Sequence, residues 1–386
     1  MAGLPRAFHW DVEPHSVASR WGTDAAHPGR ESLCREWLEL IDRTRNECLN
    51  SSTTALKLAA DISMNYDLNA TWRSGDCTAT GCVFSGPPYA PVRYPDIAGT
   101  PKLLAEHVIP KLDIAVVMAY RDDVVTDQDN IIYNVNGEVE LAEAMDVGVT
   151  ATRIVAAIET AYLGSGSIER ATFSEEGAVA AESNLTAVEQ SFASRAPFGG
   201  TAIHDYTGYS ALVAEAELAG DSAPRASGGA SAASERGLFV WSDAVVRSTA
   251  EQATFLAFVR ARGVATVYLA AWHLIEDPEV HTELIYFLNL MAENEVTVDL
   301  LYGGYNGGDG TGRHNWAEQA HHTHALNACN AAVQFVNALT LCPIGAPTPA
   351  PTPAPTPAPT PAPTTVCLGE PVTSLCYSVR TVWGPP

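Results

Sequence analysis

The sequence predicts an α/β fold, a (β/α)8 TIM barrel, and its pattern and composition both support this prediction. Short apolar runs alternate with longer amphipathic segments along most of the chain, which is typical of repeated β/α units around a parallel sheet. The chain has 386 residues, of which 46% are hydrophobic and 17% charged, so it can bury a large core. An open doubly wound sheet is the alternative, but no G-x-G-x-x-G motif follows a predicted strand.

Eight apolar runs have the length and composition of buried parallel strands, which is the number that closes such a barrel. In chain order the predicted strands are Ala7–Val12, Leu56–Ile62, Ile114–Tyr120, Arg153–Ile158, Thr201–Asp205, Leu238–Trp241, Thr266–Ala270 and Val298–Tyr302. Helices are expected after most of them, and the clearest candidates are Glu31–Asn50, Ala250–Arg262 and Trp316–Leu339.

Two stretches of unusual composition divide the chain. Gly220 to Gly237 is small and polar, and Ala346 to Thr365 repeats proline, alanine and threonine as a polyproline-type spacer. We therefore expect barrel strands in residues 1–219 and 237–343, joined by a flexible linker over 220–236. Residues 344–366 would form the spacer, and 367–386 a short cysteine-containing tail.

The charge and cysteine content indicate the compartment and exclude some partners. The net charge of -23 disfavours nucleic acid, and the absence of any run of 18 apolar residues excludes a membrane-spanning helix. Eight cysteines, three N-x-S/T sequons and the Pro/Thr spacer favour a secreted or cell-surface glycoprotein with disulfides. The first residues do not form a signal peptide, so we expect secretion through a precursor that this chain does not show.

The first predicted strand carries the most informative polar residues. Alternate side chains share one face of a strand, so His9, Asp11 and Glu13 point the same way, with Glu13 at the carboxyl end. Active sites of these barrels lie at that end. Polar groups that point into an apolar barrel are costly unless they are paired or used, which favours a functional role over a structural network.

Two further strands end in candidate site residues. Met118 and Tyr120 share the inward face of the third strand and are followed by Arg121 and Asp122. Glu159 follows the fourth strand directly.

These motifs resemble those of TIM-barrel glycoside hydrolases. The D-x-E of the first strand is similar to the D-x-D-x-E of chitinase-type enzymes, and Met118 to Asp122 resembles their M-x-Y-D with Arg121 inserted. The pair Glu13 and Glu159 also resembles the acid/base and the nucleophile of retaining barrel glycosidases. The resemblance therefore implies Glu13, Glu159 and Asp11 as catalytic residues, and Tyr120 and Asp122 as substrate-binding residues.

Other residues near the predicted mouth complete the candidate site. Histidine, tyrosine and tryptophan side chains there could bind or stack on sugars, and strand-borne acids could bind hydroxyl groups. The further candidates are His204, Asp205, Tyr206, Trp241, Asp61 and Tyr302.

The resemblance also implies an unusual strand order. In these families the D-x-E strand is the fourth, so we interpret the chain as a circular permutation that supplies strands 4–8 and then strands 1–3. A slice across two tandem barrels is the rival interpretation. The permutation places helix Trp316–Leu339 parallel to helix Glu31–Asn50, and it predicts disulfides Cys34–Cys329 and Cys48–Cys342. Local pairs are expected for Cys77–Cys82 and Cys367–Cys376.

The resulting hypothesis is a glycoside hydrolase that acts on a poly- or oligosaccharide without a cofactor. Either Glu159 is the nucleophile, or Asp11 and Tyr120 assist an N-acetyl group of the substrate. We expect Asp11 to raise the pKa of Glu13 by like-charge proximity. A non-catalytic carbohydrate-binding barrel is the second hypothesis, and a metal-dependent hydrolase using His321, His322 and His324 is the third, although no metal site is predicted. The sequence leaves the oligomeric state open.

Overall fold

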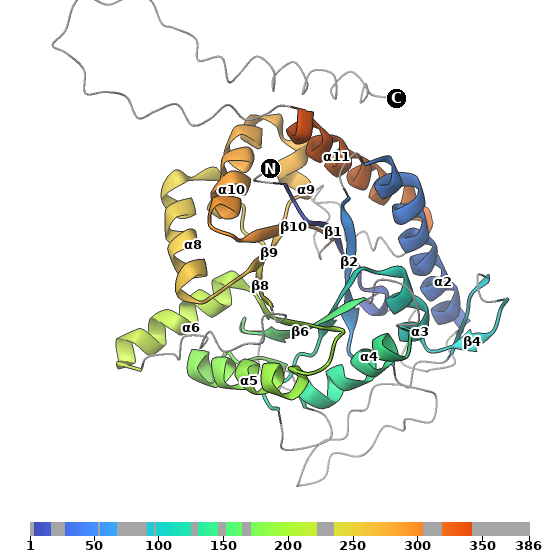
Figure 1. Ribbon diagram of the computed structural model, residues 1–386, viewed down its shortest axis with the longest axis horizontal. Coiled ribbons are helices and arrows are strands. Elements are labelled where there is room, and N and C mark those ends of the chain that lie inside the picture. Colours follow the sequence, from blue (N-terminus) through green and yellow to red (C-terminus); the bar gives the residue numbers. More distant parts are fainter. Residues whose placement is uncertain are drawn as a thin grey trace, which may run out of the picture.

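The structure is a computed structural model in which eight parallel strands close one barrel inside a ring of helices (Figure 1). It describes residues 4–16, 28–52, 55–67, 91–95, 98–124, 130–145, 152–163, 171–221, 235–303 and 319–341. Within these ranges, no helix is long and apolar enough to cross a membrane.

All eight predicted strands are present. They are β1 (Ala7–Asp11), β2 (Lys57–Ser63), β5 (Ile114–Met118), β6 (Arg153–Glu159), β7 (Phe198–His204), β8 (Glu235–Val240), β9 (Thr266–Ala270) and β10 (Thr297–Gly303). Each pairs in parallel with the next along the chain, and β10 pairs with β1 to close the ring. β3 (Val92–Arg93) and β4 (Pro101–Lys102) form a separate antiparallel pair.

Helices cover the outside of the barrel (Figure 1). They are α2 (Pro28–Arg43), α3 (Leu104–Val108), α4 (Ile131–Met145), α5 (Gly177–Phe192), α6 (Tyr206–Ala219), α7 (Ala244–Arg247), α8 (Thr249–Ala261), α9 (Trp272–Glu276), α10 (His281–Glu293) and α11 (His322–Leu341). Short helical turns are η1 (Pro14–Ser16), η2 (Thr44–Cys48), η3 (Leu49–Ser51), η5 (Ile109–Lys111), η7 (Pro278–Val280) and η8 (Gln319–His321). The predicted helix Glu31–Asn50 is thus α2 followed by η2 and η3.

Side-chain alternation divides the buried residues into two cores. Outward residues such as Phe8, Trp10 and Tyr302 join the large core between the strands and the helices. Inward residues such as Phe239 and Tyr268 form a smaller core inside the barrel. Polar side chains lie above and below this inner core, so it separates the two ends of the barrel interior.

An ion-pair network forms the amino-terminal end of the barrel. Arg6 donates to the fully buried carboxylate of Asp299 at 3.1 and 2.7 Å and to Glu235 at 2.7 Å. Arg153 donates to the other oxygen of Glu235 at 3.1 Å. These charges are therefore neutralised by one another.

The boundary of the predicted linker differs from the structure. β8 begins at Glu235, so Glu235, Arg236 and Gly237 are strand residues rather than linker. Charged residues occur in this strand because they form ion pairs: Glu235 pairs with Arg6 and Arg153, and Arg236 pairs with Glu182. A Cβ at Gly237 would clash with the Tyr268 ring, so glycine makes room for this inner-core side chain. Residues 222–234 and 342–386, including the spacer and tail, lie outside the described residues.

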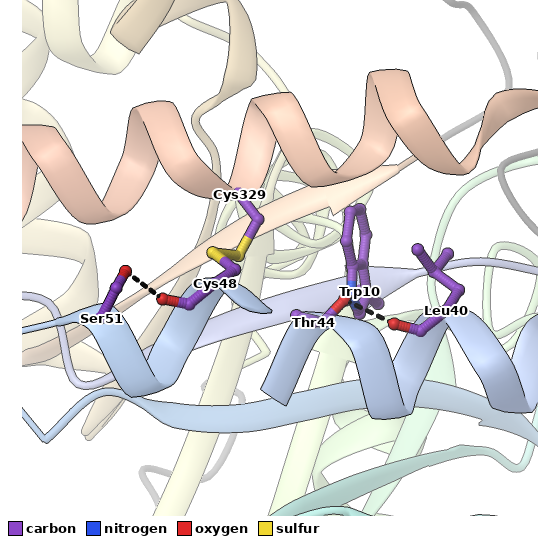
Figure 2. Close-up of a disulfide and its surroundings, with 6 residues drawn as sticks. All are labelled: Trp10, Leu40, Thr44, Cys48, Ser51 and Cys329. Carbon is purple, nitrogen blue, oxygen red and sulfur yellow. Dashed lines mark hydrogen bonds between the residues drawn. A yellow bond between two sulfur atoms is a disulfide. The ribbon is translucent and has the colours of Figure 1, made fainter. Parts of the chain in front are cut away.

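The first and last described helices meet at the seam where the barrel closes. The Gln319 N–H donates to Glu36 at 2.9 Å and Ser52 contacts Asn337 at 3.4 Å, so contacts advance in the same direction along both segments. Cys48 and Cys329 form a disulfide between them, with Cα atoms 6.2 Å apart (Figure 2). The predicted parallel packing is confirmed.

The two predicted seam pairs, Cys34–Cys329 and Cys48–Cys342, are wrong, because Cys48 bonds to Cys329. Pairing Cys34 with Cys329 would require sliding α11 along its neighbour by about four helical turns. Cys34 lies buried in the outer core, and Cys342 lies outside the described residues, as do Cys77, Cys82, Cys367 and Cys376. Near the disulfide, Trp10 of β1 donates to the Thr44 hydroxyl at 3.0 Å, and Thr44 donates to the Leu40 carbonyl at 2.7 Å (Figure 2).

We predict that the seam disulfide contributes strongly to stability. It joins residues 281 positions apart, so replacing Cys48 and Cys329 by serine frees a very long loop in the unfolded chain. The expected loss is about 3–5 kcal/mol in the free energy of unfolding, measured by urea denaturation. Reductant should destabilise the wild type but not the double variant; an equal response of both proteins would contradict the disulfide.

A buried pair of carboxyl groups joins the end of β2 to α4. The Oδ2 atom of Asp67 occupies the space that a Cβ would need on Gly137, which explains a glycine inside this helix. The neighbouring Glu138 is fully buried. Burial raises the pKa of Asp67 to about 7, and the negative charge of Glu140 contributes a smaller part of this increase. Burial and the negative charge of Asp67 raise the pKa of Glu138.

We predict that this pair makes the fold less stable as the pH rises. The folded pKa of Asp67, about 7, exceeds its ordinary value of 3.8, so the folded protein retains a proton that the unfolded chain releases between these values. The melting temperature of Asp67→Asn should therefore exceed that of the wild type at pH 8, with a smaller difference at pH 5. Glu215→Gln, an exposed control, should follow the wild type. A wild-type advantage at pH 8 would refute this account.

Candidate active site

The carboxyl ends of several strands bring candidate site residues to one end of the barrel. Asp11, Glu159 and His204 are the last residues of β1, β6 and β7. Tyr120 follows β5 and Trp241 follows β8 directly. This end carries the active sites of parallel α/β barrels.

Three polar groups lie within hydrogen-bond distance of the Glu159 carboxyl group. Its Oε1 atom accepts hydrogen bonds from the backbone N–H groups of Thr160 at 2.8 Å and Ala161 at 2.7 Å. Its Oε2 atom lies 2.6 Å from Nδ1 of His204. The side chain is 2% exposed, so these bonds replace the water it has lost. They favour the ionised form and fix its orientation.

His204 lies at the centre of the site and has a polar partner on each ring nitrogen. Trp241 donates its Nε1–H to Nε2 at 2.8 Å, while Nδ1 faces Glu159. The Tyr120 ring lies 5.8 Å from the imidazole and the Phe239 ring 5.3 Å, between centroids. Burial lowers the pKa of His204, whereas the hydrogen bond and charge of Glu159, with the charges of Asp205 and Asp11, act to raise it toward about 9. The Trp241 N–H acts against these charges, because only an unprotonated Nε2 can accept its hydrogen bond.

Asp11 is the carboxyl group whose surroundings disfavour its charge. Burial raises its pKa well above the ordinary value, and the charges of Asp61 and Glu13 raise it further, while His204 acts in the opposite direction. The sequence predicted that Asp11 would raise the pKa of Glu13. The structure shows the effect of this proximity on Asp11, whose pKa is raised first by burial and then by the charges of Asp61 and Glu13.

Glu13 lies beyond the end of β1, on the rim. It is half-buried, and its Oε1 atom is 3.7 Å from Nε2 of His15, whose Nδ1 atom is 3.2 Å from the Tyr66 hydroxyl. Burial lowers the pKa of His15, so this histidine is neutral at pH 7 and does not form an ion pair with Glu13.

Asp61 lies deeper than the sequence predicted. Its Oδ1 atom is 3.1 Å from Nε2 of His9, and both side chains are buried. The Tyr268 ring meets His9 edge-on at 5.1 Å, so the pair rests on the inner core. Asp61 therefore acts on the site through its charge, which helps to raise the pKa values of Asp11 and Tyr120.

Tyr120 is a neutral phenol beside the carboxyl groups. Burial raises its pKa well above the ordinary value, and Glu159, Asp61 and Asp11 raise it further. The carbonyl of Tyr120 accepts a hydrogen bond from Arg121 at 2.6 Å. Asp122 follows, half-buried, at the start of the next loop.

Three of the predicted site residues lie elsewhere. Tyr302 points outward and stacks on Phe8 at 4.6 Å between ring centroids, so it is a core residue. Asp205 caps the amino terminus of α6 by accepting the Gly208 N–H at 2.9 Å. Tyr206 packs on Phe255 and Phe258 of α8. The sequence analysis treated His204 and Tyr206 as alternate residues of one strand, but β7 ends at His204 and α6 begins at Tyr206.

Sequence analysis missed two kinds of group in this site. The backbone donors of Thr160 and Ala161 depend on the turn after β6, which no side-chain pattern indicates. Phe239 could have been found, since it is two residues before Trp241 and alternation puts both inside the barrel.

The described residues contain no group of three or more His, Cys, Asp or Glu side chains that could hold a metal ion. Of the three histidines considered for such a site, His322 is buried at the start of α11. The arrangement that remains can donate a proton from Asp11 and present a fixed negative charge on Glu159.

Comparison of the chain with protein-family models, with curated proteins and with solved structures finds no match.

Proposed function

We propose that the protein is a glycoside hydrolase whose active site lies at the carboxyl end of the barrel. The observation that carries this proposal is that two carboxyl groups in different surroundings, Asp11 and Glu159, both lie close enough to His204 to raise its pKa. Asp11 lies among groups that disfavour its charge, while Glu159 accepts three hydrogen bonds that favour its charge. Most glycoside hydrolases use one protonated and one ionised carboxyl group.

The proposed mechanism assigns a task to each group. Asp11 protonates the leaving oxygen as its bond to the anomeric carbon breaks, and Glu159 attacks that carbon or stabilises its developing positive charge. Water then adds to the anomeric carbon and gives its proton to Asp11, which frees Glu159. Tyr120 is a neutral donor beside this centre. The resemblance to retaining barrel glycosidases implied Glu13 as the acid. We assign the proton to Asp11 because it is the more deeply buried carboxyl, and Glu13 is a charge that keeps it protonated.

Asp11 and Tyr120 could instead assist an N-acetyl group of the substrate, as in chitinase-type enzymes. The three donors that fix Glu159 favour the first mechanism, since substrate assistance leaves this carboxylate without a task. Product anomers followed by NMR, with substrates that have or lack a 2-acetamido group, distinguish the two.

We further propose that the protein is extracellular and acts on an uncharged polysaccharide. The seam disulfide and the exposed Asn50, the first residue of an N-x-S sequon, support an oxidising compartment. The net charge of -23 suits an uncharged ligand. The circular permutation also stays a proposal, because a closed ring of eight parallel strands does not mark one strand as the first.

We predict that single amide substitutions abolish turnover and leave the fold intact. Glu159→Gln and Asp11→Asn should each lower kcat on a labelled glycoside by at least about 100-fold, because each removes one half of the acid and carboxylate pair. The measurement is hydrolysis of a panel of labelled poly- and oligosaccharides, with circular dichroism to verify folding.

Glu215→Gln on the exposed face of α6 is the matched control and should keep full activity. Glu13→Gln should shift the acidic form of Asp11 to a lower pH range and lower kcat less than Asp11→Asn. Binding of a polysaccharide without turnover by the wild type would overturn the proposal in favour of a carbohydrate-binding barrel. Activity lost on chelation would indicate a metal-dependent hydrolase.

A further inference from the structure

Trp241 has a contact that a sugar-stacking or packing role does not explain. It is half-buried at the end of β8, and its indole N–H points at a ring nitrogen of His204, 2.8 Å away. An indole nitrogen can only donate a hydrogen bond, so Nε2 of His204 must accept it. An acceptor nitrogen carries no proton.

The other ring nitrogen then determines the state of the whole imidazole. Nδ1 lies 2.6 Å from the Glu159 carboxylate, which can only accept. The proton of a neutral ring must therefore lie on Nδ1, and the two contacts together select one tautomer.

We propose that Trp241 is a positioning residue that holds His204 as the neutral Nδ1–H tautomer and thereby keeps the Glu159–His204 pair negatively charged. The proposal rests on the function assigned to Glu159 above. A carboxylate that faces a developing positive charge is effective only while it is ionised and not neutralised by a cation beside it.

The surrounding charges act in the opposite direction. Glu159, Asp205 and Asp11 all favour a protonated imidazole, and burial disfavours it. The rings of Tyr120 and Phe239 also face His204 and carry no charge at neutral pH. Within the described residues around this ring, Trp241 is thus the group whose hydrogen bond selectively stabilises the neutral form. Without it, the imidazole would take a second proton and form a neutral ion pair with Glu159.

Trp241→Phe tests this proposal, because phenylalanine keeps an aromatic ring and removes the N–H. In ¹⁵N NMR spectra at pH 7, wild-type His204 should show one protonated and one unprotonated nitrogen. In Trp241→Phe both nitrogens should be protonated, and the second proton should leave only in more alkaline solution. Trp272→Phe, at the start of α9, is the matched control and should leave the His204 spectrum unchanged.

The activity of the same variants provides a second measurement. For each unit by which the pKa of His204 exceeds the pH, the fraction of neutral ring falls about tenfold. Trp241→Phe should therefore lower kcat by about tenfold or more at pH 7, and the deficit should shrink as the pH rises. Loss of a merely structural or stacking contact would give a deficit that does not depend on pH.

Two results would overturn the proposal. One is a doubly protonated His204 in the wild type at pH 7, and the other is a neutral His204 in Trp241→Phe. Neither needs a substrate, so the proposal can fail while the glycosidase assignment stands. If instead no glycoside is hydrolysed but the tautomer changes as expected, only the glycosidase assignment fails.

Discussion

The alternation of side chains around a closed parallel barrel is the constraint on which the rest of this structure depends. Once β10 pairs with β1, every second residue of each strand must point inward. Apolar residues such as Phe239 and Tyr268 fill the middle of that interior. The polar side chains of the inward positions are thereby confined to two ends, each surrounded by an apolar wall that strengthens electrostatic interactions.

The charged side chains are arranged differently at the two ends of the barrel interior. At the amino-terminal end, Arg6 and Arg153 neutralise Asp299 and Glu235, so the charges form a structural network. At the carboxyl end, the described residues facing Asp11 are mainly acids, and a proton on that group relieves their repulsion. Backbone and imidazole donors instead stabilise the charge on Glu159. The same barrel therefore holds one network suited to stability and one suited to proton transfer.

The sequence was sufficient to predict the barrel because its signals are local. Alternating apolar runs locate the strands, the period of two places His9, Asp11 and Glu13 on one face, and Glu159 was located by its place at the end of a strand. Predictions from the sequence were wrong where they depended on contacts between residues far apart in the chain. The register between α2 and α11 is set by packing along the whole seam, so the predicted pairing of Cys34 with Cys329 was wrong although the two segments are neighbours.

Other differences arise where strands end. A strand prediction gives no depth in the barrel, so it could not show that burial raises the pKa of Asp11. Similarly, the sequence assigned Glu235 and Arg236 to the linker, because their partners are distant in the chain: Arg6 just before β1, Arg153 on β6 and Glu182 on α5. The donors to Glu159 come from the backbone, which side-chain patterns do not reveal.

The central claim is that Asp11 is protonated while Glu159 is ionised at the same pH. It is tested most directly by ¹³C NMR titration of the two carboxyl carbons, each assigned by its amide variant. The account predicts that at pH 7 Asp11 has the chemical shift of a carboxylic acid and Glu159 that of a carboxylate. Two ionised groups at pH 7, or a proton on Glu159 instead of Asp11, would contradict it.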